Sequence, residues 1–207
     1  MNTIRSCLAL GALVLAPLAL SAQPAPTASR FSLEVSGDGA FPVSKFRGAD
    51  LDAGFGLGAN VRVRVQQHLL AYAGWEWHRF ATNELIVASK NDVEETGYTF
   101  GLRFEHPFRG DATAGQGRAS GVGYWVRAGG LYNHVEIEND AGTIIGDTKH
   151  GLGWELGGGL TIPMTQRLAL TPGVRYRSLT RDLTLGSSTR SATLAQVNAM
   201  VGLTIAF

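Results

Sequence analysis

Apolar residues occupy every second position in the last stretch of the chain, from Val197 to Phe207. The residues between them are polar or small, with the exception of Met200. Strict alternation is typical of a β-strand with one apolar face and one polar face. Residues 52–65 repeat the pattern, with alanine, phenylalanine, leucine and valine alternating with glycine, asparagine and arginine. Together with 27 glycines and no second long apolar segment, these stretches favour an all-β protein.

The same alternation predicts eight strands, at about residues 30–36, 52–65, 69–78, 95–105, 122–135, 150–162, 168–178 and 192–207. Residues 122–135 are the least regular, because Trp125 and Leu131 fall on the polar face; a bulge near Gly129 and Gly130 is one possible repair. The connections 66–68 and 163–167 are predicted to be short turns. Longer loops are predicted at 37–51, 79–94, 136–149 and 179–191, and one connection, 106–120, is long where a short turn is expected.

The length and charge of these strands favour a membrane barrel. Residues 52–65 are longer than a soluble core requires, whereas a tilted strand that crosses a bilayer needs about 9–11 residues. An arginine that faces lipid costs about 2–4 kcal/mol at mid-bilayer, so the charged face must point into a lumen. The last strand would pair with the first and leave no open edge. We therefore predict an eight-stranded antiparallel transmembrane up-and-down β-barrel, with short periplasmic turns and both termini in the periplasm.

The N-terminal segment has the features of an export signal. Residues 1–22 carry one charge, Arg5, then an apolar run and small residues at the expected cleavage position, which predicts a signal peptide. An uncleaved N-terminal anchor is the alternative, although the apolar run is short for a membrane helix. Residues 23–29 form a short leader, and residues 30–207 form the barrel domain. Cys7 is the only cysteine and lies in the predicted signal, so we expect no disulfide in the mature chain.

Basic and acidic side chains are balanced, which gives no electrostatic reason to expect a nucleic-acid partner. Without Arg5, 17 basic and 17 acidic residues remain. Ten of these charged residues fall on the predicted lumen face, and an eight-stranded lumen is narrow enough to be filled by side chains. They are predicted to pair as a plug, with a gated or narrow polar channel as the alternative. This lumen charge network consists of Glu34, Arg62, Arg64, Glu76, Arg103, Glu105, Arg127, Glu155, Arg175 and Arg177.

Aromatic residues fall near both ends of the predicted strands, where membrane interfaces favour them. The predicted girdle consists of Trp75, Trp77, Tyr98, Phe104, Tyr124, Tyr132, Trp154 and Tyr176. A carbohydrate-binding platform is the alternative interpretation. The glycines of 54–58 and 151–159 match no complete nucleotide-binding motif and are interpreted as small inward-facing residues.

The strand number, the terminal Phe207 and the run Gly151–Tyr176 resemble small Gram-negative outer-membrane barrels of the OmpA/OmpX/OmpW and opacity-protein type. The resemblance covers the predicted mature chain and implies a fold more than an activity. It implies a cell outer membrane location, Phe207 as an assembly signal read by the barrel-assembly machinery, and porin-like relatives. The peptidoglycan-binding domain that follows the barrel in OmpA is expected to be lacking.

Two families of barrels of this size are lipid A-modifying enzymes, and their motifs are missing here. The deacylases use a late His-x-Ser pair, whereas the last histidine, His150, is followed by Gly151 and Leu152. The palmitoyltransferases need an Asp-Ser pair, which does not occur in this sequence. We therefore predict a non-enzyme with no catalytic residues, no cofactor and no metal site. The acids Glu138, Asp140 and Asp147 are interpreted as a solvated loop; a divalent-cation site is the alternative, although their spacing fits no known cation-binding loop.

The predicted function is the display of surface loops on a rigid barrel, in a structural, adhesion or envelope-integrity role. The alternative is a narrow outer-membrane channel for ions or small apolar solutes, and a lipid A-modifying enzyme is a third, less favoured alternative. The expected partners are outer-membrane lipid and lipopolysaccharide, the assembly machinery through the C-terminal strand, and a surface ligand. Loop 136–149 is the first candidate for the ligand contact, because Ile144 and Ile145 are expected to form an exposed apolar pair in an acidic segment.

Overall fold

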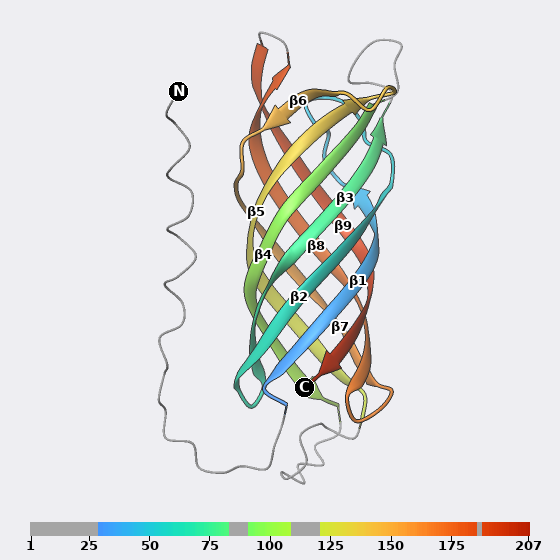
Figure 1. The fold of residues 1–207 in the computed structure, drawn as a ribbon, viewed down its shortest axis with the longest axis vertical. Helices are drawn as coiled ribbons and strands as arrows, with labels where there is room; N and C mark the ends of the chain where they lie inside the picture. Colours follow the sequence, from blue (N-terminus) through green and yellow to red (C-terminus); the bar gives the residue numbers. More distant parts are fainter. Residues whose placement is uncertain (1–28, 83–90, 109–120, 186–187) are drawn as a thin grey trace, which may run out of the picture.

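In the computed structural model, residues 29–82, 91–108, 121–185 and 188–207 are described. The predicted signal peptide and nearly all of the leader lie outside these ranges. The described chain forms one antiparallel sheet that closes on itself (Figure 1). Its strands are β1 (Phe31–Pro42), β2 (Gly54–Gln66), β3 (Leu69–Thr82), β4 (Asn91–Pro107), β5 (Gly123–Asn139), β6 (Ile144–Thr148), β7 (Gly151–Pro163), β8 (Leu168–Leu185) and β9 (Ser188–Ala206).

Eight long strands complete the ring, as the alternation predicted. Each pairs with its neighbour in the chain, and β9 closes the ring by pairing with β1 from Ser32↔Ala206 to Pro42↔Gln196. The short β6 is a ninth strand, inserted between β5 and β8 at one end of the barrel (Figure 1). Closure leaves no unpaired edge along the barrel wall. Across the described ranges, no α-helix is long and apolar enough to cross a membrane.

The two ends of the barrel differ. At one end, which we call the turn end, Gln67–His68 and residues 164–167 link neighbouring strands, and Phe31 and Ala206 lie there too. The opposite end, the loop end, carries residues 43–53 and β6. Most of the predicted connection 106–120 lies outside the described residues, as do residues 83–90 of the predicted loop 79–94. The rest of that predicted loop is strand, because residues 79–82 belong to β3 and residues 91–94 belong to β4.

The strands extend further toward the loop end than the alternation predicted. Residues 37–42 belong to β1, and residues 136–139 belong to β5, where a loop was expected. The predicted loop 179–191 is largely strand, because β8 and β9 stay paired as far as Leu185↔Ser188. The reason is chemical: toward the loop end the outward-facing residues of β5 and β8 become polar and the inward-facing ones apolar, so the alternation changes sign although the hydrogen-bonded ladder continues. In β1, Gly37 and Gly39 interrupt the pattern instead.

Strand β5 contains no bulge near Gly129 and Gly130, which corrects the proposed repair. Its register with β4 is unbroken from Asn91↔Asn139 to Pro107↔Gly123. Trp125 and Leu131 therefore point into the barrel, and both are buried.

Small residues make room for the Trp125 ring. A Cβ added at Gly159 would lie 2.8 Å from Trp125 Cε2, and one at Gly173 would meet the same ring. Trp125 Nε1 donates a hydrogen bond to the carbonyl oxygen of Leu160 at 3.1 Å, so the polar end of the ring is satisfied.

Candidate functional site

Inward-facing charged side chains fill the middle of the barrel. They arrive there because alternate residues of every strand point inward. Eight of the ten predicted network residues are buried: Glu34, Arg62, Glu76, Arg103, Arg127, Glu155, Arg175 and Arg177. The other two, Arg64 and Glu105, lie at the turn end with side chains 28% and 20% exposed, and their nearest charged atoms are 3.9 Å apart.

Glu34 is the centre of the layer nearest the turn end. Arg103 Nη1 lies 3.1 Å from Glu34 Oε2, and Arg62 Nη1 lies 3.3 Å from the same oxygen. The hydroxyls of Thr171 and Thr204 donate to it at 2.8 and 3.2 Å. Arg103 also lies over the Trp125 ring, with 4.4 Å between its Cζ and the ring centroid. The carboxylate is thus fully engaged by cations and hydroxyls.

Glu76 and Glu155 share the arginines of the middle layer. Glu155 pairs with Arg127 and accepts hydrogen bonds from Tyr72 Oη at 2.7 Å and Thr99 Oγ1 at 2.8 Å. Glu76 pairs with Arg175, and its other oxygen lies 3.4 Å from Arg177 Nη2. Because each acid touches more than one arginine, removing a single carboxylate would leave several buried cations undercompensated.

A third layer, nearer the loop end, contains acids that the sequence analysis did not assign to the network. Asp38 Oδ2 lies 3.0 Å from Arg175 Nη2, and Glu95 Oε1 lies 3.1 Å from Arg177 Nη2. His78 stands between them: Arg177 Nη1 lies 2.7 Å from its Nδ1, and its Nε2 lies 3.2 Å from Asp38 Oδ1. The sequence did contain an indication for Asp38: it is four residues from Glu34, so the two side chains point to the same face of a strand.

Amide side chains complete the third layer. Asn198 Nδ2 donates to Asp38 at 2.6 Å, and Gln196 Nε2 donates to Glu95 at 2.9 Å. Each of these two acids therefore has at least one cation and one neutral donor. The inward face of β9, which reads as plain polar residues in the sequence, supplies these neutral donors.

Beyond the charged layers the inward side chains become apolar. We call this group the apolar cap; its buried members are Ala40, Phe46, Phe80, Val93, Leu131, Val135, Ile137, Leu179, Leu183, Ala192 and Leu194. Phe46 reaches it from the connection after β1, where Phe46 and Ala49 exchange backbone hydrogen bonds of 2.9 and 3.0 Å. Arg47 and Gly48 adopt positive φ angles of 54° and 89° in that tight turn. The cap therefore packs across the loop end of the lumen.

On the outer surface, the aromatic residues of the predicted girdle lie on neighbouring strands. Trp75, Tyr98 and Tyr132 are successive cross-strand partners, and the Trp154 and Tyr176 rings are 5.2 Å apart. Trp77 packs on Phe55 at 5.4 Å between ring centroids. At the turn end, the Phe104 and Tyr124 rings are 6.2 Å apart, and Phe207 is exposed on the outer face. The structure thus places these rings in two groups, one toward each end.

Charged residues replace apolar ones on the outer face just beyond the loop-end aromatic group. Arg79 forms an ion pair with Asp92. Its Nη1 lies 3.0 Å from Glu94 Oε1, and its Nη2 lies 4.0 Å from Glu138 Oε2. Trp77 Nε1 donates to Glu94 at 3.0 Å, which links the aromatic and charged zones. We call this charged zone the outer rim.

The predicted loop acids and the apolar pair lie near the outer rim, but not in a free loop. Ile137 pairs with Gly146 and Glu138 with Ile144, so the register skips Ile145. Ile144 is exposed, whereas Ile145 packs against the apolar cap. The expectation of two exposed isoleucines is therefore wrong for Ile145, and the cause is the bulge in β6.

The comparisons with known proteins agree with this architecture. Residues 11–204 match the family model described as outer membrane protein beta-barrel domain. Neisserial surface protein A is 14% identical with a TM-score of 0.56, covering 86% of this chain and 98% of its own. OprG from Pseudomonas aeruginosa is 13% identical with a TM-score of 0.58, covering 88% and 98%. The E. coli outer membrane protein W is 15% identical with a TM-score of 0.54, covering 87% and 98%. No curated protein sequence matches significantly.

Proposed function

The chain belongs to the outer membrane protein β-barrel family and is a protein of the outer membrane; from this premise we propose a non-enzymatic barrel that displays a surface. Its role is structural, adhesive or in envelope integrity. Barrels of this kind direct short turns to the periplasm and the opposite end outward. The loop end and the outer rim are then the surfaces that an external partner can reach.

The burial of charged and apolar side chains inside the described barrel is the observation that carries this proposal. Three layers of paired charges fill the middle of the barrel, and the apolar cap packs above them. The buried acids of these layers are each held by an arginine, so none is available as a general acid or base. A filled interior gives a rigid scaffold, and binding concentrates on segments that vary without disturbing such a scaffold.

The proposed partners follow from what each surface presents. The apolar outer face contacts membrane lipid, and the outer rim meets the headgroup level of lipopolysaccharide. Arg79 is the only arginine of the rim in the described outer faces of β3, β4 and β5, so anionic groups have one cation to approach there. The exposed Phe207 and the apolar face of β9 are proposed to be read by the barrel-assembly machinery.

A narrow channel for ions or small apolar solutes is the second candidate. The observation that favours it is the change of the inward surface from charged to apolar between the middle layers and the cap. A solute could pass through the lumen only if the side chains of the apolar cap moved apart and several ion pairs broke. In the described residues the cap side chains pack against one another.

Planar-bilayer conductance of the refolded mature protein separates the two candidates. We expect no unitary steps at voltages where a porin refolded in the same way gives them. In parallel, a deletion strain complemented with the wild-type protein provides an adhesion or detergent-sensitivity phenotype against which rim variants are scored. Reproducible unitary steps from the wild-type barrel would overturn the closed-scaffold proposal in favour of the channel.

A further inference from the structure

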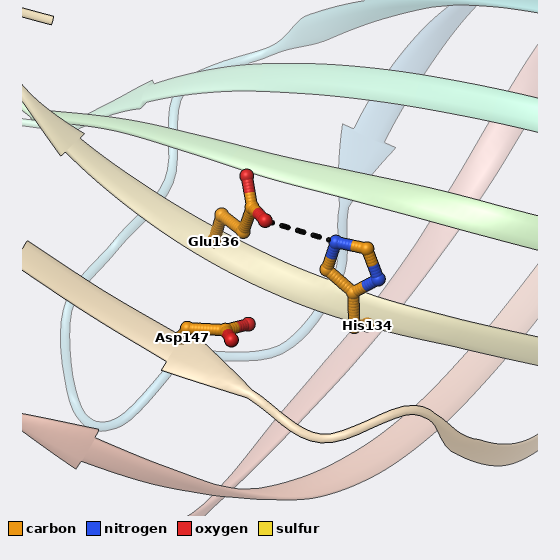
Figure 2. A group of neighbouring side chains, drawn as sticks. All are labelled: His134, Glu136 and Asp147. Atoms are coloured by element: carbon orange, nitrogen blue, oxygen red, sulfur yellow. Dashed lines mark hydrogen bonds and ion pairs between the residues drawn. The ribbon is translucent and has the colours of Figure 1, made fainter. Parts of the chain in front are cut away.

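Two histidines and two acids meet on the outer face near the loop end. His134 and Glu136 are alternate residues of β5, and β6 brings Asp147 opposite Glu136 in the ladder. Figure 2 shows the three side chains, with the carboxylate of Glu136 turned toward the His134 ring. His134 Nε2 lies 3.1 Å from Glu136 Oε1, and one ligand atom from each of the three residues lies within 4.8 Å of the others.

The acids of this group create a local excess of negative charge. Glu94, Glu136 and Asp147 are successive cross-strand partners on β4, β5 and β6. Like charges directly opposite one another destabilise a sheet unless a cation lies between them. Arg79 forms an ion pair with Glu94. Within the described residues, neither Glu136 nor Asp147 forms an ion pair with an arginine or lysine. His134 is the nitrogen ligand that faces these two carboxylates.

The second histidine orients the first. His134 Nδ1 lies 2.9 Å from His150 Nε2, and the two ring centroids are 4.2 Å apart. If Nδ1–H donates to His150, the lone pair of His134 Nε2 points toward Glu136. A metal-binding histidine commonly holds its other ring nitrogen in such a hydrogen bond, which fixes the ring and its tautomer. The His150 ring in turn packs on Tyr132 at 5.3 Å.

From this geometry we propose a divalent transition-metal site of the Zn²⁺ class, formed by His134 Nε2 and the carboxylates of Glu136 and Asp147. Imidazole with carboxylate oxygen suits Zn²⁺ better than Ca²⁺ or Mg²⁺, which prefer oxygen alone. Ligand atoms around a tetrahedral Zn²⁺ are about 3.3 Å apart for bonds of about 2.0 Å, close to the separation of His134 and Glu136. Three protein ligands leave the remaining position open to solvent. His150 is a positioning residue that holds the His134 ring.

The site joins two strands that are separated by a turn. Glu136 and His134 belong to the barrel wall, whereas Asp147 lies on the short β6. A bound ion would therefore tie β6 to β5 at the outer rim. This inference differs from the sequence-based expectation of no metal site. The pairing of β6 with β5, which brings Asp147 opposite Glu136, could not be seen in the sequence.

The test is titration of EDTA-treated, refolded full barrel with ZnCl₂ by isothermal calorimetry. We expect saturable binding that is lost in His134→Ala and weakened at least tenfold in Asp147→Asn. His150→Ala should weaken binding about 10–100-fold without abolishing it, as for other residues that orient a metal ligand. Zn²⁺ should also raise the unfolding midpoint of the wild-type protein, a readout that His134→Ala should lack.

Matched controls use a histidine and an acid outside the group. His106→Ala removes a histidine at the turn end, and Asp140→Asn neutralises an exposed acid in the turn before β6. Neither should change the His134-dependent binding, and heat-dependent gel mobility confirms that every variant is folded. Absence of saturable binding to the wild-type barrel would overturn the proposal. Binding that survives His134→Ala, or falls equally in His106→Ala, would also overturn it.

Discussion

Arg175 on β8 donates to Asp38 on β1 inside the lumen, with 3.0 Å between Nη2 and Oδ2, although 137 positions separate the two residues. The pair bypasses β9, which lies between these strands in the wall and supplies Asn198 to the same carboxylate. The lumen network therefore braces strands that are not hydrogen-bonded neighbours. Its members act together, so the effects of single substitutions are not expected to add.

Glu76 is the acid at which the network should be most sensitive. Glu76→Gln removes the charge that compensates Arg175, Arg177 and Arg127 while keeping the side-chain shape. Breaking a buried pair by removing one partner costs about 3–5 kcal/mol. We expect a loss of that order in the free energy of unfolding, measured by urea denaturation in lipid vesicles. Asp140→Asn, which neutralises an exposed acid, should leave the midpoint unchanged. An unaltered midpoint for Glu76→Gln would mean that water reaches the network, and would favour the channel.

The fit of Trp125 against glycine gives a second prediction. A Cβ at Gly173 would meet the Trp125 ring and lie 2.7 Å from the carbonyl oxygen of Gly158, so Gly173→Ala forces the wall outward. Overpacking of this kind costs about 1–3 kcal/mol. Gly37→Ala is the matched control, because its Cβ would meet its nearest neighbours at 3.7 and 3.8 Å, an ordinary contact. Urea midpoints of the two alanine variants measure the difference, and equal midpoints would contradict the packing argument.

The sequence predicted the eight long strands correctly because the alternation that reveals them follows from a period of two. It missed Asp38 because that residue falls inside the segment 37–51 that was interpreted as a loop, and it missed Glu95 because that residue is the first of the predicted strand 95–105. Asp38 is flanked by Gly37 and Gly39, and Glu95 directly follows a polar stretch. Near the loop end the outward residues become polar and many inward ones apolar, so the pattern that reveals a strand changes sign although the backbone pairing continues.

The outer cluster required information that alternation does not contain. His134 and Glu136 share a face by spacing alone, but Asp147 joins them only through the pairing of β6 with β5. That register includes a skipped residue, Ile145, and a one-residue shift reverses the face of every later side chain. For the same reason, the sequence alone could not show that Ile144 is exposed whereas Ile145 packs against the apolar cap.

The C-terminal residue provides a third prediction, about assembly. Phe207 is exposed on the outer face, and its backbone N–H donates to the carbonyl oxygen of Phe31 at 3.1 Å. Phe207→Asp keeps this backbone bond and places a charge where an apolar ring is presented. We expect it to lower the amount of folded barrel in outer-membrane fractions far more than Ala206→Ser, whose side chain points inward. If both variants reach the membrane equally, Phe207 is not an assembly signal.

The last prediction separates the structural and surface roles of the isoleucines in β6. Ile145→Ser inserts a hydroxyl beside the apolar cap and removes a partly buried side chain, so we expect a loss of about 1–2 kcal/mol in unfolding free energy. Ile144→Ser changes an exposed residue opposite Glu138 and should stay within about 0.5 kcal/mol of the wild type. If this segment contacts a partner, Ile144→Ser should weaken the surface phenotype of a complemented deletion strain while the barrel remains fully folded. Full rescue by that variant, at wild-type abundance in the outer membrane, would remove Ile144 from the binding surface and shift attention to the connection at residues 43–53.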